Sequence, residues 1–366
     1  MKKTIFIVAA ARPNFIKIAP FYKHISKFPD LTLFLIHTGQ HYDYNMSDTF
    51  FNTLDIPTPD VHLNIGSGSH AEQMGKTMIA FEQLCLKHQP CMVLVFGDVN
   101  ATAACAITAK KCLIPVAHVE AGLRSFDREM PEEINRILTD SISDILYTTA
   151  EDAQAQLLKE GIPKANILFV GNVMIDTLFH HLDQSESTHF YETLNLKKKE
   201  YSMITLHRPS NVDNPSILHD LVNVFIDIAT FLPVVFSVHP RTKKQLQSFD
   251  FYEKLNQHPN ITLLEPIGYL ENINLVANSR LVLTDSGGLQ EETTALNIPC
   301  LTLRRNTERP VTISHGSNRL VGVTPKRILK EIHQIIDHTS PKYPTPSLWD
   351  GQASHRILKH LNTWLN

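Results

Sequence analysis

Charged and polar side chains recur where apolar runs with the length of buried strands come to an end. Asp98 follows MVLVFG, Glu120 stands near the end of PVAHVEA, and His207 closes SMITLH. Because ligands in open parallel sheets bind beyond the carboxyl ends of the strands, we expect these side chains to line one site. Two carboxylates that end neighbouring strands can exchange protons with a substrate, which is general acid–base chemistry.

Each of these residues also has a structural explanation. An aspartate such as Asp98 commonly caps a helix, here the helix expected from Ala101, and a lone histidine such as His207 more often serves as a core or cap residue. Glu120 is harder to explain in this way, because burying an unpaired carboxylate in an apolar strand end is costly. The adjacent cation Arg208 favours a functional role for His207.

The segment MPEEINR predicts a helix that starts at Pro131. Its first turn contains Glu132 and Glu133, which the helix dipole alone would favour, and this explanation suits Glu133 well. Arg136 lies one turn further on and can pair with either carboxylate. The residues alone therefore leave the role of Glu132 open.

The stretch LTDSGGLQEE predicts a strand, a turn at Gly287 and Gly288, and a helix start. The N–H groups of a helix N-terminus bind anions, and glycines let a phosphate come close. A tight connection without any ligand explains an isolated Ser-Gly-Gly equally well. Glu292 lies more than one turn into this helix, where it can accept hydrogen bonds from ribose hydroxyls. Arg309, in the segment TERP, follows the next strand within reach of the same anion.

A cationic pair is expected at the start of the first helix. Arg12 precedes Pro13, which favours a first helical turn, and Lys17 lies further along the same helix. A solvated helix start is the simpler explanation, and anion binding is the alternative. No G-x-G-x-x-G motif occurs there, which argues against a nicotinamide cofactor. The 19 histidines show no ligand spacing typical of a metal site.

Length and composition limit the class of protein. A chain of 366 residues exceeds the roughly 250–300 at which single cores stop growing, so we expect two domains. The 43% hydrophobic and 19% charged residues suit a globular protein with a large core. A formal net charge of −3 without a basic stripe argues against nucleic-acid binding. No apolar run approaches the ~18 residues of a membrane span, and five cysteines without a C-x-x-C pair suit a reducing cytoplasm.

Two series of apolar runs alternate with helical patterns. The runs are nearly continuous, as strands covered on both faces should be, and therefore predict an α/β fold with doubly wound parallel sheets. We place a first domain at 1–174, a second at 175–352, and a helix at 353–366 that we expect to pack back on the first domain. The runs begin at Thr4, Leu31, Met92, Pro115, Asp144 and Ile167, and then at Ser202, Pro233, Ile261, Leu281, Pro299 and Arg319.

Eight ordered blocks together resemble the non-hydrolysing UDP-N-acetylglucosamine 2-epimerases, over nearly the whole chain. The resemblance implies two Rossmann-like domains of the glycosyltransferase-B type around an interdomain cleft. It also implies a cytoplasmic, homodimeric isomerase of polysaccharide biosynthesis that needs neither nicotinamide nor metal. The blocks are ARPNFIKIAP, HTGQHYD, FGDVNAT, HVEAGLRS, MPEEINR, TLHRPSN, TDSGGLQEE and TERP.

The mechanism that the resemblance implies is elimination of UDP to a 2-acetamidoglucal, reprotonation of C2 from the opposite face, and re-addition of UDP. Matching positions make Asp98, Glu120 and Glu132 the acidic residues of this step, without dividing base from acid, and make His207 a phosphate or leaving-group partner. The residues that it assigns to UDP binding are Arg12, Lys17, Ser286, Gly287, Gly288, Glu292 and Arg309.

The chain also departs from the family pattern. Ala10 and Asn14 replace a glycine and a carboxylate, and Pro209 interrupts the block that often reads HRREN. Asp43 stands where regulated bacterial members carry a glutamine, which argues against allosteric activation.

The residues leave room for functions besides that of the plain epimerase. The HTGQHYD block is also similar to relatives that epimerise UDP-2,3-diacetamido-glucuronic acid, whereas TERP favours the plain N-acetylglucosamine substrate. A UDP-sugar glycosyltransferase of the same fold, a hydrolysing epimerase and a non-catalytic nucleotide-sugar binding protein are three further candidate functions.

Overall fold

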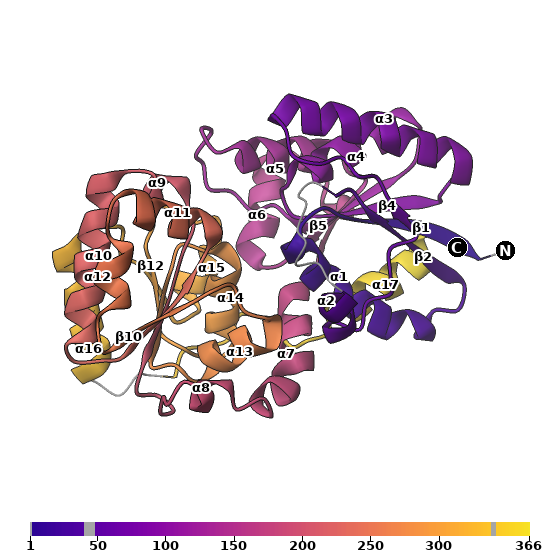
Figure 1. Cartoon of the computed structure of the whole chain (residues 1–366). Helices are drawn as coiled ribbons and strands as arrows, with labels where there is room; N and C mark the ends of the chain where they lie inside the picture. The colour runs from indigo at the N-terminus through magenta and orange to yellow at the C-terminus, as the bar shows by residue number, and fades with distance from the viewer. Residues whose placement is uncertain (1, 40–47, 338–341) are drawn as a thin grey trace. The chain divides into compact units, whose positions relative to one another are not determined.

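The computed structural model describes residues 2–39, 48–337 and 342–366 (Figure 1). The chain divides into two compact units, which are described separately below. Unit 1 consists of Met1–Thr177 and Ser347–Asn366, and unit 2 consists of Leu178–Pro346. The boundary after Thr177 falls inside helix α7, Val173–Glu186.

Unit 1 contains a seven-stranded sheet in the order β3-β2-β1-β4-β5-β6-β7. Every neighbouring pair of strands in it is parallel. The order reverses between β1 and β4, which is the topological switch point of a doubly wound sheet. The strands are β1 (Lys3–Ala9), β2 (Leu31–His37), β3 (Val61–His62), β4 (Met92–Phe96), β5 (Val116–Ala121), β6 (Ile145–Thr148) and β7 (Ile167–Phe169).

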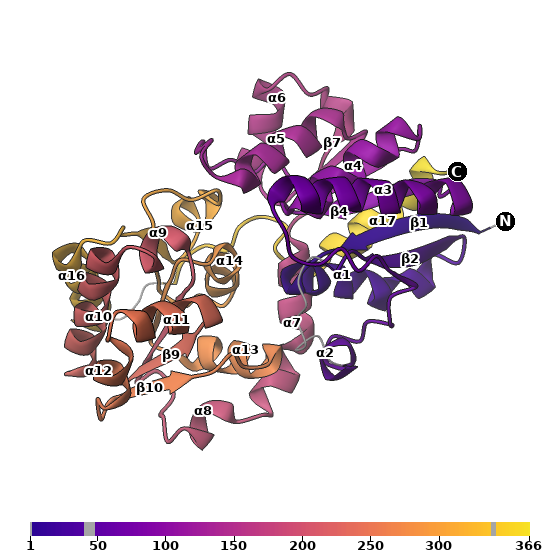
Figure 2. The same cartoon turned by 45° about the horizontal axis from the view of Figure 1, so that its top comes forward.

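Helices cover both faces of this sheet. Figures 1 and 2 show α3, α4 and α5 on one face and α1 with α17 on the other. On the α3 face, Phe6 and Val8 of β1 join one apolar core with Phe81 and Cys105. The helical segments of unit 1 are α1 (Arg12–His24), η1 (Ile25–Lys27), α2 (Asp48–Thr53), α3 (His70–His88), α4 (Asn100–Lys111), α5 (Pro131–Ile142), α6 (Glu151–Lys159), η2 (Lys164–Asn166) and α17 (Ala353–Trp364).

The last helix, α17, is held to unit 1 by a buried carboxylate. Asp176 accepts hydrogen bonds from the backbone N–H groups of Ala353 and Ser354, at 3.0 and 2.7 Å. Trp364, near the end of α17, stays 46% exposed. Trp349 is the buried tryptophan instead, and its indole N–H donates to the carbonyl of Thr149.

Unit 2 contains a six-stranded sheet in the order β10-β9-β8-β11-β12-β13, again parallel at every pair. One face carries a core shared with α10 and α16, and the other a smaller core shared with α13 and α14. The strands are β8 (Ser202–Leu206), β9 (Val234–Val238), β10 (Ile261–Leu264), β11 (Leu281–Thr284), β12 (Cys300–Thr302) and β13 (Asn318–Leu320). The helices are α8 (Phe190–Thr193), α9 (Pro209–Val212), α10 (Pro215–Ala229), α11 (Pro240–Ser248), α12 (Tyr252–Asn256), α13 (Tyr269–Asn278), α14 (Gly287–Ala295), α15 (Val311–Ser314) and α16 (Pro325–Asp337).

The predicted fold class, two doubly wound parallel sheets, is confirmed. The two-residue strand β3, at the edge of the first sheet, was not predicted, because so short a strand produces no apolar run. No helix in the described part of the chain has the length and apolar character needed to cross a membrane.

Candidate active site

In unit 1, helix α1 carries Lys17 against Glu120 near the end of β5. The ammonium Nζ of Lys17 lies 2.5 Å from Oε2 of Glu120, and both side chains are buried. Gly97, just after β4, leaves the room for this pair. It has a φ of +63°, and a Cβ there would lie 2.7 Å from the Lys17 nitrogen. An opposite charge this close favours the ionised carboxylate.

Glu120 adopts a backbone conformation that is rare for a residue with a side chain. Its φ is +76°, and the pairing of β5 with β6 shifts register between Val119 and Ala121. A left-handed conformation at such a residue costs on the order of 1–3 kcal/mol and persists only where its surroundings enforce it, commonly at functional sites. The bulge therefore directs the Glu120 carboxylate to a place that a regular strand would not.

Asp98 follows β4 and pairs with a cation. Its Oδ2 accepts a hydrogen bond from the Arg136 guanidinium, while its own side chain stays 26% exposed. The capping alternative for Asp98 is wrong, because the N-cap of α4 is Val99 and no side chain caps that helix. The amide of Asn135 also donates to the Asp98 carbonyl, at 2.9 Å, so α5 fixes this turn from two positions.

The two glutamates of MPEEINR lie in different environments. Glu133 is buried and accepts hydrogen bonds from the N–H groups of Ser125 and Phe126 and from Arg136. Burial alone would raise the pKa of Glu133, but these bonds lower it. Glu132 is half-buried and takes part in no ion pair of the described residues. Glu133 therefore holds the loop after β5, whereas the Glu132 carboxylate is available for chemistry.

A buried polar network lies behind these carboxylates, and it was not predicted from the sequence. Nδ1 of His118 lies 2.6 Å from Asp140, and Nε2 lies 2.9 Å from the carbonyl oxygen of Gly97. Arg124 pairs with Asp140 at 2.7 Å and with Glu160 at 2.6 Å. The signal was present in the sequence, because polar residues inside an apolar strand such as VAHVEA require partners when buried.

The remaining predicted cation of unit 1, Arg12, begins α1 with its guanidinium 5.3 Å from the centre of the Phe50 ring. It is half-buried. Gln40, His41 and Asp43 lie outside the described residues.

In unit 2, the glycine turn opens α14 as expected. Ser286 is the N-cap residue, its side chain makes no capping hydrogen bond, and the helix begins at Gly287 and continues through Gly288. A Cβ at Gly287 would lie 2.6 Å from a guanidinium nitrogen of Arg309. The turn thus places the N–H groups of a helix N-terminus beside a guanidinium, which is a suitable environment for an anion.

Arg309 is buried among carboxylates. Its Nε lies 3.0 Å from Glu291, and Nη1 lies 2.5 Å from Glu308. Glu308 also pairs with Arg304 at 2.8 Å, and Arg208 approaches it at 3.9 Å. Burial alone would raise the pKa of Glu308, but Arg309 and Arg304 hold it well below the ordinary value. Three cations, Arg309, Arg304 and Arg208, thus lie around Glu308, and Glu291 pairs with the first of them.

His207 ends β8 with a carboxylate beside it. Its Nδ1 lies 2.9 Å from Oδ1 of Asp285, which is fully buried after the neighbouring strand β11. Asp285 also accepts hydrogen bonds from the backbone N–H groups of His207 and Arg208 and from the Asn211 amide. Burial alone would raise the pKa of Asp285, but His207 and these hydrogen bonds lower it. A carboxylate that fixes one ring nitrogen leaves the other to face a ligand.

Glu292 is a buried carboxylate, and its hydrogen bond with Tyr269 is long. The Tyr269 hydroxyl lies 3.5 Å from its Oε1, and Glu291 is its neighbour in the chain. Burial, together with the charge of Glu291, raises the pKa of Glu292 to about 8. Donors supplied by a ligand, such as hydroxyl groups, would favour its ionised form.

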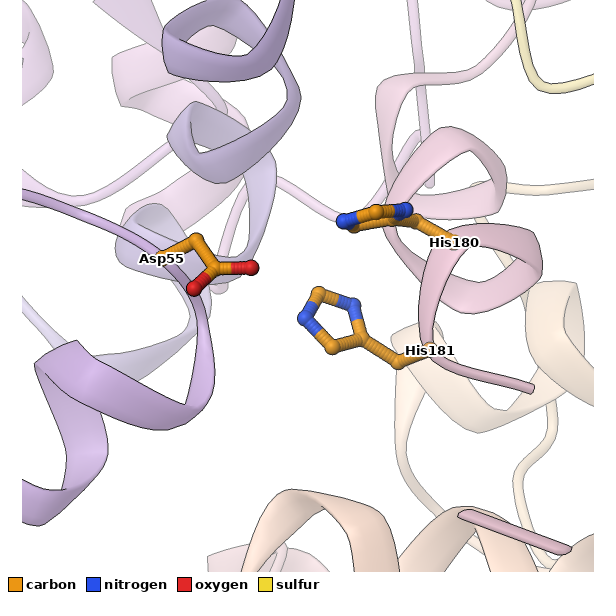
Figure 3. A group of neighbouring side chains, drawn as sticks. All are labelled: Asp55, His180 and His181. Atoms are coloured by element: carbon orange, nitrogen blue, oxygen red, sulfur yellow. The ribbon is translucent and has the colours of Figure 1, made fainter. Parts of the chain in front are cut away.

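His180 and His181 are adjacent on α7, in unit 2. Their ring centres lie 4.8 Å apart (Figure 3). Within unit 2 they supply two ligands, and a structural zinc site needs four. Asp55, also drawn in Figure 3, belongs to unit 1.

Comparison with known families shows which family the chain belongs to. The family model for UDP-N-acetylglucosamine 2-epimerase matches residues 23–362. The chain belongs to the UDP-N-acetylglucosamine 2-epimerase family. This confirms the resemblance carried by the eight sequence blocks, and it identifies the chain as a relative of isomerases.

Individual relatives of this epimerase family match the chain from end to end. A UDP-N-acetylglucosamine 2-epimerase homolog of Methanococcus maripaludis is 47% identical over 98% of this chain and 99% of the relative. A UDP-2,3-diacetamido-2,3-dideoxy-D-glucuronate 2-epimerase of Pseudomonas aeruginosa is 39% identical over 98% and 99%.

A solved structure matches as well. The UDP-GlcNAc 2-epimerase of Methanocaldococcus jannaschii, in complex with UDP-GlcNAc and UDP, is 42% identical. It has a TM-score of 0.91 and covers 98% of this chain and 99% of its own. The expected glycosyltransferase-B type of fold therefore agrees with an epimerase of known structure.

Proposed function

We propose that the chain catalyses the reversible epimerisation of UDP-N-acetylglucosamine to UDP-N-acetylmannosamine. The observation that carries the proposal is the family match over residues 23–362. The substrate is supported by the 42% identical Methanocaldococcus jannaschii epimerase, whose structure contains UDP-GlcNAc and UDP.

We propose that the reaction proceeds by elimination and re-addition. A base removes the proton from C2 while the C1–O bond breaks with its electron pair leaving on UDP, which gives 2-acetamidoglucal. Protonation of C2 from the opposite face and attack of the UDP oxygen at C1 then give the epimer. Two proton-handling groups on opposite faces of the sugar are required.

The carboxylates of unit 1 are the groups that we assign to this proton transfer. Glu120 has an ammonium 2.5 Å away, which favours the ionised form that a base requires. We propose Glu120 as the base in one direction, with Asp98 and Glu132 supplying the proton on the other face.

The nucleotide groups are assigned to the anion site of unit 2. We propose that the N–H groups from Ser286 to Gly288 bind the diphosphate and that Arg309 adds positive charge. The Asp285-oriented ring of His207 stabilises the charge that develops on the leaving UDP. We propose that Glu292 accepts hydrogen bonds from the ribose hydroxyls. The resemblance also implies Lys17 here, but its contact with Glu120 leads us to assign it to that carboxylate.

Incubation with UDP-GlcNAc in heavy water tests this function. Epimerisation by this route incorporates deuterium at C2 of both UDP-sugars, which NMR detects directly. Transfer of the sugar to an acceptor without exchange at C2 would identify a glycosyltransferase instead, and release of free N-acetylmannosamine would identify a hydrolysing epimerase.

A decorated substrate is the second candidate, favoured by the 39% identity to the Pseudomonas aeruginosa enzyme over almost the whole length of both chains. A panel of UDP-sugars that differ at C3 and C6 separates the two. Faster C2 exchange with the diacetamido-glucuronate than with UDP-GlcNAc would assign the decorated substrate.

We further propose that the protein is a cytoplasmic homodimer. Ile79 and Leu86 lie seven residues apart on one face of α3 and are 68% and 61% exposed, which suits a subunit interface. All five cysteines are free, as is usual in a reducing compartment. Light scattering of the purified protein, compared with an Ile79→Asp/Leu86→Asp variant, tests the dimer.

A further inference from the structure

Asp140, in α5, forms hydrogen bonds on both sides of Glu120. One carboxylate oxygen lies 2.6 Å from Nδ1 of His118, and the other accepts from the backbone N–H of Gly122 at 3.0 Å. His118 precedes Glu120 by two residues, and Gly122 follows it by two. A single buried carboxylate therefore holds both flanks of the bulge that presents Glu120.

This arrangement acts on an irregular stretch of β5. Glu120 has a φ of +76°, and the pairing of β5 with β6 shifts register between Val119 and Ala121. A left-handed conformation at a residue with a side chain relaxes unless its neighbours are fixed. The two hydrogen bonds to Asp140 fix those neighbours.

His118 extends the same network to the turn that carries Asp98. Its Nε2 lies 2.9 Å from the carbonyl oxygen of Gly97, the residue before Asp98. Both ring nitrogens thus face oxygen atoms, one of Asp140 and one of the Gly97 backbone. One imidazole in this way connects the two turns that carry Asp98 and Glu120.

Arg124 completes the network from the loop after β5. Its guanidinium lies 2.7 Å from Asp140 and pairs with Glu160 through Nε and Nη2, at 2.9 and 2.6 Å. His118, Asp140 and Arg124 are each at most 5% exposed. Buried polar groups that are fully satisfied in this way rigidify their surroundings.

We propose that Asp140 and His118 are positioning residues, which fix Glu120 and the Asp98 turn in the geometry that C2 proton transfer requires. The proposal rests on the function proposed above. Neither side chain needs to touch the sugar, because both act through the backbone that carries the two carboxylates.

The test compares Asp140→Asn and His118→Ala with a matched control that contacts the same strand, β5. Asp144 also accepts a hydrogen bond from β5, at the N–H of Val116 at the opposite end, and pairs with Lys110. Asp144→Asn therefore removes a comparable carboxylate contact far from the proposed chemistry. We expect kcat of the first two variants to fall by about 100-fold, as for a misplaced catalytic group, with KM and UDP affinity within about twofold.

Conservative replacements of His118 separate positioning from folding. Asparagine places a donor near the Nδ1 position and so restores the bond to Asp140, so His118→Asn should recover about tenfold of the loss in His118→Ala. This recovery is the decisive readout if Asp140→Asn proves too unstable to purify.

The positioning role would be overturned if the kcat values of Asp140→Asn and His118→Ala both lay within about threefold of the kcat of Asp144→Asn. Equal kcat values for His118→Asn and His118→Ala would overturn it as well. The wild-type protein serves as the reference for the proposed function. If it exchanges no C2 hydrogen of any UDP-sugar, the epimerase function fails, whereas unaffected variants of an active wild type refute the positioning role alone.

Discussion

Nδ1 of His207 lies 2.9 Å from Oδ1 of Asp285, and the same carboxylate accepts hydrogen bonds from the backbone N–H groups of His207 and Arg208. Asp285 therefore fixes both the ring and the chain segment that carries it. The strands β8 and β11, which end at these residues, are neighbours in the sheet. A change at Asp285 should consequently affect both catalysis and folding.

Asp285→Asn should lower kcat by at least about 100-fold, because the amide no longer favours the ring orientation that the leaving UDP requires. It should also cost about 1–3 kcal/mol of folding stability through the weakened backbone hydrogen bonds. Steady-state kinetics and chemical denaturation measure the two effects.

The lowered pKa of Asp285 also makes folding stability depend on pH. The stabilisation that the Asp285 carboxylate contributes is complete above the ordinary pKa of 3.8 and is lost as the pH falls through the folded-state pKa. Asp285→Asn should remove that acid-side loss. Wild-type turnover in this variant would argue against the role of His207.

Lys17→Met should lower turnover by about 100-fold and leave UDP affinity within about twofold, because the ammonium contacts Glu120. Isothermal titration with UDP and C2 exchange rates test the two parts separately. A tenfold or greater loss of UDP affinity would instead support the role on the diphosphate that the sequence resemblance implies. Lys17→Arg keeps the charge but not the compact shape, so we expect only partial activity from it.

Gly97→Ala should lower activity by more than its loss of folding stability explains. A Cβ at this position would lie 2.7 Å from the Lys17 nitrogen, and φ is +63°. Gly161 offers a matched control, because its φ is +88° and no atom lies within 4 Å of a Cβ placed there. Both variants should lose a similar roughly 1 kcal/mol through the backbone, measured by thermal unfolding, and only Gly97→Ala should lose C2 exchange. Equal activity of the two variants would show that the Lys17 position is unimportant.

Glu292→Gln should remove a pH dependence of stability between about pH 4.5 and 8. Burial raises the folded-state pKa of Glu292 from 4.5 to about 8, so the folded state binds this proton more tightly than the unfolded chain. Its contribution is therefore complete below about pH 4.5 and is lost as the pH rises through about 8. Thermal unfolding from pH 5 to 9, with and without UDP, measures it. An unchanged slope in Glu292→Gln would show that another group titrates.

The sequence predicted the parts of the site that depend on strand ends and helix starts. The helices that begin at Pro131 and Gly287 were predicted from proline and glycine chemistry, and the apolar runs located the long strands. The pairing of β8 with β11 was not predicted, so the contact of His207 with Asp285 was missed. The Lys17–Glu120 pair was missed for the same reason, because it connects the first helix to the fifth strand.

The buried network of His118 and Asp140 was missed for a different reason. Asp140 reads as an ordinary polar residue within a helix, and its burial follows only from the packing of α5 on β5. The left-handed backbone of Glu120 leaves no trace in the sequence, since glutamate has no preference for it.

The order in which the chain is made has a consequence for the first unit. Because residues 347–366 belong to it, unit 1 stays incomplete until residue 366 has been synthesised, while unit 2 has its whole sequence earlier. Helix α17, which contacts α1 and buries Ile357, Leu358 and Leu361, is therefore missing from unit 1 until then. Nascent chains stalled before residue 347 should need chaperone protection that the finished protein does not.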